Sequence, residues 1–124
     1  MKVFSILILT VCILVLVACT KDIGPNPDLV KTEFCDTITF TKHVKPIIIK
    51  RCVSCHTAGG FAAAYGDFNT DTYTGIKPKV DNGTFKGRVI DLTITPTMPF
   101  GMTALPADTI AILKCWLEAG APNN

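Results

Sequence analysis

Residues 52–56 read Cys-Val-Ser-Cys-His, and this stretch determines how the rest of the 124-residue chain is interpreted. Two cysteines three positions apart, at a helical turn, present their sulfurs to the two vinyl groups of one porphyrin. The histidine that follows brings its imidazole to the iron from the same side. The pentad (residues 52–56) therefore predicts covalent attachment of one haem c through Cys52 and Cys55, with His56 as an axial ligand.

Two other kinds of site use closely spaced cysteines. A zinc site needs a fourth ligand, and only His43, Cys35 or Cys115 remain to supply one, without the second close-spaced pair that is usual in such sites. A thioredoxin-like redox pair needs a βαβ pattern, which this chain lacks. Both alternatives are weaker than haem attachment.

Met98-Pro99-Phe100, 42 residues beyond His56, offers a second axial ligand. A thioether sulfur is a soft donor that favours ferrous iron, so a His/Met pair raises the reduction potential. Pro99 restricts Met98 to an extended conformation. Met102 is the rival ligand, with packing at the haem edge as its other role, and His43 is expected at the surface or beside the propionates.

Hydrophobic periodicity predicts short helices separated by long loops. The first is capped by Thr41 and runs to Arg51, with Val44, Ile47 and Ile48 on its buried side. Pro46 removes an amide donor, so this helix starts later or is kinked there. Further helices are expected at about 70–80, with Tyr73, Ile76 and Val80 at helical spacing, and at 85–92 after the turn at 81–83.

The last helix has the clearest pattern. Asp108 lies in its first turn and Gly120 closes it. Its expected buried face comprises Ile110, Leu113 and Leu117, flanked by Ile112 and Trp116.

The first 18 residues have the pattern of an export signal. One positive charge at Lys2 precedes an apolar run that ends Leu16-Val17-Ala18-Cys19. This end resembles the lipobox of bacterial lipoproteins, so we expect cleavage before Cys19 and acylation of its thiol. An uncleaved anchor helix or an ordinary signal is the alternative. Two or more acyl chains give stable membrane attachment.

Residues 19–34 contain Gly24-Pro25-Asn26-Pro27 and few apolar side chains, which predicts an extended tether. The net charge is +2, and removal of the signal takes Lys2 away. So small a charge indicates no attraction to nucleic acid. The organisation expected is therefore a signal (1–18), a lipidated tether (19–34) and one domain (35–124).

Residues 35–124 resemble the small class I c-type cytochrome domains, especially their lipoprotein versions. The resemblance rests on Val44-Lys45-Pro46-Ile47-Ile48 before the pentad, on Met98-Pro99, and on a Trp116 helix that ends Gly120-Ala121-Pro122. It implies an all-α domain of three to four short helices, with Cys52, Cys55, His56 and Met98 binding the haem. The sequence departs from the family at Phe100, where proline is frequent, and at Pro106, where a capping serine is expected.

The resemblance also bears on Cys35 and Cys115, which lie near the two ends of the domain. In this family the first and last helices cross, and export to an oxidising compartment permits a disulfide between such positions. The alternative is that Cys115 is an ordinary core residue of its helix.

The function expected is electron transfer on the outer side of a membrane, with an unidentified redox partner, as a monomer or as a subunit of an envelope complex. No catalytic set accompanies the motif. A haem enzyme or gas sensor with an open iron site, or a structural docking subunit, are the alternatives. A docking rim for an acidic partner, or merely a solvated face, is expected at Lys42, Lys45, Lys50, Arg51, Lys77, Lys79, Lys86 and Arg88.

Overall fold

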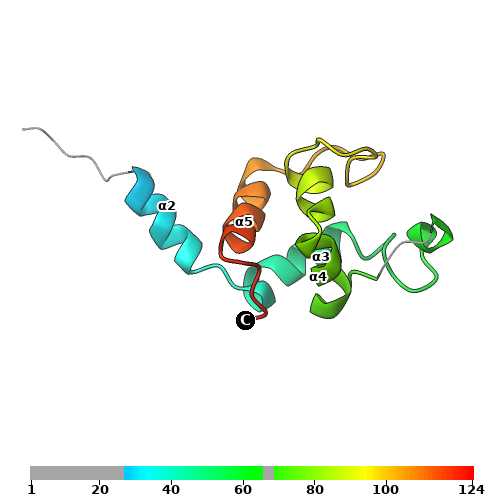
Figure 1. Cartoon of the computed structure of the whole chain (residues 1–124), viewed down its shortest axis with the longest axis horizontal. Coiled ribbons are helices and arrows are strands. Elements are labelled where there is room, and N and C mark those ends of the chain that lie inside the picture. The colour runs from blue at the N-terminus through cyan, green and yellow to red at the C-terminus, as the bar shows by residue number, and fades with distance from the viewer. Residues whose placement is uncertain (1–26, 66–68) are drawn as a thin grey trace, which may run out of the picture. The chain divides into compact units, whose positions relative to one another are not determined.

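A computed structural model describes residues 27–65 and 69–124, which form helices and contain no strand (Figure 1). An all-α fold is thereby confirmed for this part of the chain. The chain divides into two compact units, residues 1–30 and 31–124. The elements in order are α2 (Pro27–Asp36), η1 (Phe40–Val44), α3 (Lys45–Arg51), η2 (Phe61–Tyr65), α4 (Tyr73–Asp81), η3 (Lys86–Ile90) and α5 (Ala107–Glu118).

The helix expected before the pentad forms in two pieces, the π-helical turn η1 and the α-helix α3. Thr39, not Thr41, is the N-cap, and its hydroxyl accepts the N–H of Lys42. Pro46 lies in the first turn of α3, where a missing amide donor costs no intrahelical hydrogen bond. The α-helix α3 begins at Lys45, one residue before Pro46, although the helical run as a whole starts at Phe40. Val44 and Ile48 are fully buried as expected, whereas Ile47 is only half-buried.

The helices expected at about 70–80 and at 85–92 are confirmed as α4 and η3, although their first and last residues differ by one to three positions from those expected. α4 begins at Tyr73 because the Thr72 side chain accepts the N–H of Gly75, which caps the helix at that point. The turn before η3 contains Gly83 at φ +77°, a left-handed conformation that glycine adopts without steric cost.

Trp116 on α5 lies at the centre of the core. Its ring packs against the rings of Phe40 and Phe85, and its side chain is completely buried together with Leu113. Leu117, which was expected on the buried face, is only half-buried. The prediction that Trp116 merely flanks the buried face is therefore wrong, because Trp116 itself is at the centre of that face. The physical reason is that aromatic partners from η1 and from the residue before η3 meet on the Trp116 side of the helix.

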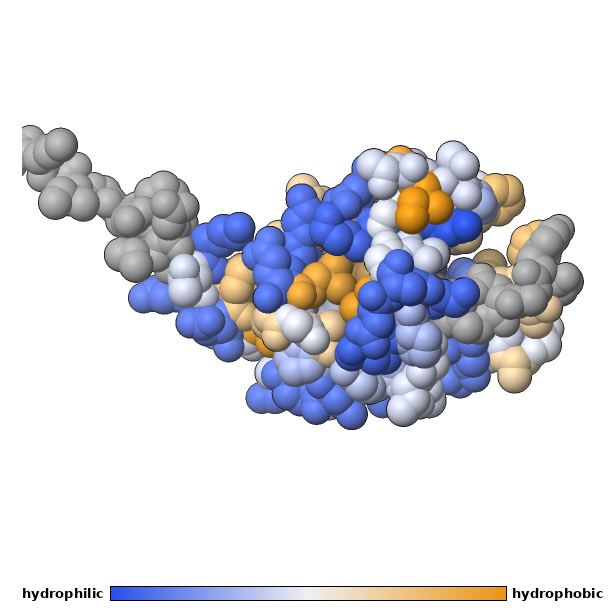
Figure 2. All heavy atoms as spheres, in the orientation of Figure 1, coloured by the Kyte–Doolittle hydropathy of each residue, from blue (hydrophilic) through white to orange (hydrophobic). Residues whose placement is uncertain are grey.

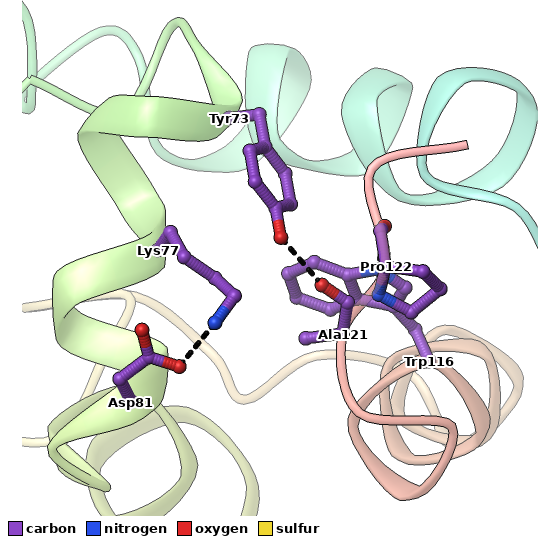
Figure 3. A network of polar contacts seen from close by, with 6 residues as sticks. All are labelled: Tyr73, Lys77, Asp81, Trp116, Ala121 and Pro122. Carbon is purple, nitrogen blue, oxygen red and sulfur yellow. Dashed lines mark hydrogen bonds and ion pairs between the residues drawn. The ribbon is translucent and has the colours of Figure 1, made fainter.

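The C-terminal tail is held against the helices by hydrogen bonds (Figure 3). Tyr73 of α4 donates its hydroxyl to the carbonyl of Ala121 at 2.8 Å. The indole N–H of Trp116 donates to the carbonyl of Pro122 at 2.9 Å. Asn124 then accepts two backbone amides at the start of η1, one through its side chain and one through its carbonyl. The tail therefore ties α4, α5 and η1 together.

The expectation of an extended tether up to residue 34 is corrected over residues 27–34, which belong to α2. Pro27 is the first helical residue, where its fixed φ favours the helix and no amide is needed. Cys35, in the last turn, is bonded to Cys115 of α5 by the disulfide that the family resemblance suggested. The signal, Cys19 and the tether up to residue 26 lie outside the described residues. No helix in 27–65 or 69–124 has the length and apolarity needed to cross a bilayer.

Loss of the disulfide should destabilise the domain strongly. The bridge closes a loop with a sequence separation of 80 residues. The chain-entropy model assigns such a loop about 4 kcal/mol of unfolding free energy or slightly more. Urea unfolding of Cys35→Ser followed by circular dichroism should show this loss, and reduced wild type should match the variant. Equal stability of the oxidised wild type and the variant would contradict the bridge.

Candidate haem site

The pentad forms a tight turn that continues directly from α3. Cys52 N–H donates to the Ile48 carbonyl at 2.8 Å, and Cys55 and His56 both donate to the Cys52 carbonyl, at 3.1 and 2.9 Å. Both cysteines are free thiols, Cys52 half-buried and Cys55 exposed. Local hydrogen bonds thus place both thiols and the imidazole on one turn, as the spacing predicts.

The thiol of Cys52 does not have the properties of a redox-active cysteine. Burial, and to a smaller extent the neighbouring Cys55, raise its pKa to about 11. The thiol is therefore protonated at neutral pH, whereas thiol–disulfide exchange requires a thiolate and redox-active CxxC cysteines have lowered pKa values. This turn lacks the electrostatic activation of a thioredoxin-like site.

The backbone of His56 is held by Thr70, a residue that sequence reasoning missed. Both the N–H and the hydroxyl of Thr70 donate to the His56 carbonyl, at 2.9 and 3.2 Å. Thr70 is only 4% exposed. Nothing in a single sequence marks a loop threonine 14 residues away as the partner of His56. The Nδ1 atom of the His56 ring is itself buried.

The return of the loop after the pentad requires a glycine. Ala62 N–H donates to the Cys55 carbonyl at 3.1 Å, and a Cβ on Gly60 would collide with that same carbonyl oxygen. The loop therefore folds back against the pentad, and the bonds at Cys55 and Thr70 fix its two ends.

Of the two candidate methionines, Met98 is directed toward the core. Its side chain packs against the same hydrophobic cluster as Cys52 and Val53, whereas Met102 is 61% exposed. The N–H of Met98 donates to the Arg88 carbonyl at 2.9 Å, so the chain is anchored at this residue. Burial and anchoring favour Met98 over Met102 as an iron ligand.

Exposed apolar side chains concentrate in the segments that carry the proposed ligands. Of the seven large apolar side chains that the described residues expose, five lie there: Phe61, Leu92, Ile94, Phe100 and Met102. Figure 2 shows apolar atoms at the surface over the loop that follows η3. Four of the five lie in residues 92–102, the segment that also carries Met98, so this segment exposes apolar surface of the kind that ligand sites use. A porphyrin, which is large and apolar, fits the chemistry of these segments.

The remaining candidate ligands have other partners. His43 accepts the N–H of Thr39 on Nδ1 at 3.1 Å and thereby helps to cap η1. The disulfide removes Cys35 and Cys115 as zinc ligands. In the part of the chain that the structure describes, no three His, Cys, Asp or Glu side chains converge as they do around a small metal ion. Haem needs no such convergence, because the sulfurs bond to the porphyrin edge.

Several of the basic side chains expected in a docking rim have partners within the domain. Lys77 pairs with Asp81, as Figure 3 shows, and Lys86 pairs with Asp91. Arg88 donates to the carbonyl of Pro96 at 2.9 Å. These contacts support the alternative of a solvated face for Lys77, Lys86 and Arg88.

Comparison with known proteins gives no further indication of what these residues do. The chain matched no family model, no curated protein and no solved structure. The resemblance to c-type cytochromes therefore rests on this chain's own residues: the pentad, the segment 44–48 before it, the Met98-Pro99 pair and the Trp116 helix. The function is accordingly inferred from the chemistry of these residues.

Proposed function

We propose that this protein is an electron carrier with one haem c, bound covalently through Cys52 and Cys55. The observation that carries the proposal is the pentad turn: two free thiols and His56 on one turn. The exposed apolar side chains in the segment that carries Met98 and in the one that follows the pentad support it.

His56 and Met98 are the axial ligands in this proposal, and the bound haem iron supplies a one-electron couple between ferric and ferrous states. The chain's own residues hold these ligands in place. Thr70 fixes the His56 backbone, and the Arg88 carbonyl fixes the backbone of Met98. Backbone hydrogen bonds of this kind limit the movement of the segments that carry His56 and Met98, which suits electron transfer better than catalysis at an open iron.

The optical spectrum of the purified holoprotein tests this function. We expect low-spin, six-coordinate haem in both oxidation states, reversible one-electron reduction, and no rapid binding of carbon monoxide to the ferrous protein. Heat-unfolded protein, in which the methionine is released, should bind carbon monoxide and is the positive control. A five-coordinate wild type that binds carbon monoxide at once would replace the carrier with the enzyme or sensor alternative.

The proposal places the carrier on the outer side of a membrane, attached through lipid on Cys19. Intact mass of the exported protein should show loss of residues 1–18 and addition of acyl chains. Cys19→Ser should release the protein from the membrane fraction, and Cys12→Ser, a cysteine substitution inside the apolar run, should not. A soluble wild-type product that begins at another residue would contradict the lipid anchor.

A further inference from the structure

The loop that carries Met98 is bonded to η3 by several hydrogen bonds. We define the Met98 loop as residues 91–102. The carbonyl of Gly87 accepts the amides of Thr93 and Ile94, at 2.8 and 3.2 Å. Gly87 has no side chain, and a Cβ there would collide with the side chain of Ile94. The first half of the loop therefore lies directly against η3.

Arg88 holds the second half of the loop at two points. Its backbone carbonyl accepts the Met98 N–H at 2.9 Å, and its guanidinium Nη1 donates to the Pro96 carbonyl at 2.9 Å. Pro96 and Met98 are two residues apart, so one arginine binds both ends of the tripeptide that ends in the candidate ligand. Guanidinium is always charged and reaches the carbonyl on a long stem, which makes the contact insensitive to pH.

We propose that Arg88 is a positioning residue for Met98: its guanidinium keeps the Met98 loop closed so that the thioether stays on the iron. This inference rests on the proposed function. The iron–methionine bond is weak, so its occupancy depends on how often the loop opens. A hydrogen bond from a charged group to the loop backbone lowers that frequency.

Hydrogen exchange of the holoprotein provides a direct test. Arg88→Ala removes the bond to Pro96 but leaves every backbone carbonyl in place. We expect the Met98 amide to exchange roughly threefold to tenfold faster, because one surface hydrogen bond from a charged group is lost. The amide of Ala119, bonded to the Cys115 carbonyl outside the Met98 loop, should change little and serves as the internal control.

A competition measurement connects the loop to the iron. Imidazole should displace the methionine from Arg88→Ala at a roughly threefold to tenfold lower concentration than from wild type, followed as loss of the near-infrared band of iron–methionine bonding. Lys77→Ala is the matched control, since it removes one positive charge and an ion pair with Asp81 on α4 without touching the Met98 loop. Arg88→Lys keeps the positive charge and hydrogen-bond donors. It should therefore restore part of the wild-type resistance to imidazole.

The outcomes separate the inference from the function on which it rests. If Arg88→Ala matches wild type within twofold in both measurements, or if Lys77→Ala has the same effect, the role of Arg88 is wrong and the electron carrier stands. If wild type has no near-infrared band, the assignment of Met98 fails, and the inference fails with it.

Discussion

Substitution of both pentad cysteines by alanine should abolish covalent haem. With Cys52 and Cys55 removed, only axial coordination remains, and acid acetone breaks coordination bonds. We expect haem peroxidase staining of the denatured wild type on gels, much weaker staining of Cys55→Ala, and none for the double variant. Intact mass should lose the increment of one haem in parallel.

A matched control for this experiment lies inside the pentad. Ser54 is exposed between the two cysteines, and its hydroxyl makes only a weak 3.9 Å contact with the Cys55 sulfur. Ser54→Ala should therefore keep full staining. Extraction of all haem from the wild type by acid acetone would show that the attachment is not covalent and would favour a different site.

Substitution of the distal ligand should convert a closed iron site into an open one. Met98→Ala should abolish the near-infrared band and let ferrous iron bind carbon monoxide. It should also lower the potential by on the order of 0.1 V, a fraction of the roughly 0.8 V that axial ligands span. The physical reason is the loss of a soft sulfur donor that stabilises ferrous iron.

Met102→Ala is the control for this substitution, because the Met102 side chain is largely exposed in the same loop. It should leave the band, the potential and carbon monoxide binding nearly unchanged. An opened iron also gains peroxidase activity, so Met98 separates the electron carrier from the haem enzyme. If only Met102→Ala removes the band, the function stands and the ligand assignment moves to Met102.

The basic rim illustrates a limit of counting charges along a sequence. Eight basic residues were candidates for partner docking, but Lys77, Lys86 and Arg88 make contacts within the domain. The contacts of Lys77 and Lys86 are surface ion pairs, which contribute little to stability. They do, however, reduce the charge available to a partner.

Local sequence patterns predicted the features that depend on near neighbours along the chain. The spacing of the pentad places its thiols on one turn, because residues three positions apart along the chain lie close together in space. Helical periodicity correctly placed Val44, Ile48, Ile76 and Leu113 in the core, because burial on one helical face repeats every three to four residues. The pairing of Cys35 with Cys115 came from family resemblance, not from periodicity.

The distant residues that support the site are apparent only in the folded protein. Thr70 binds the His56 carbonyl and Arg88 binds the Met98 loop through irregular segments that have no periodic pattern to read. Trp116 became the centre of the core because aromatic rings from two other segments converge on it. The start of α2 at Pro27, inside an expected tether, was likewise a structural result. Hydrogen bonds and ring contacts between remote residues depend on the path of the loops, and a single sequence does not encode that path in any local pattern.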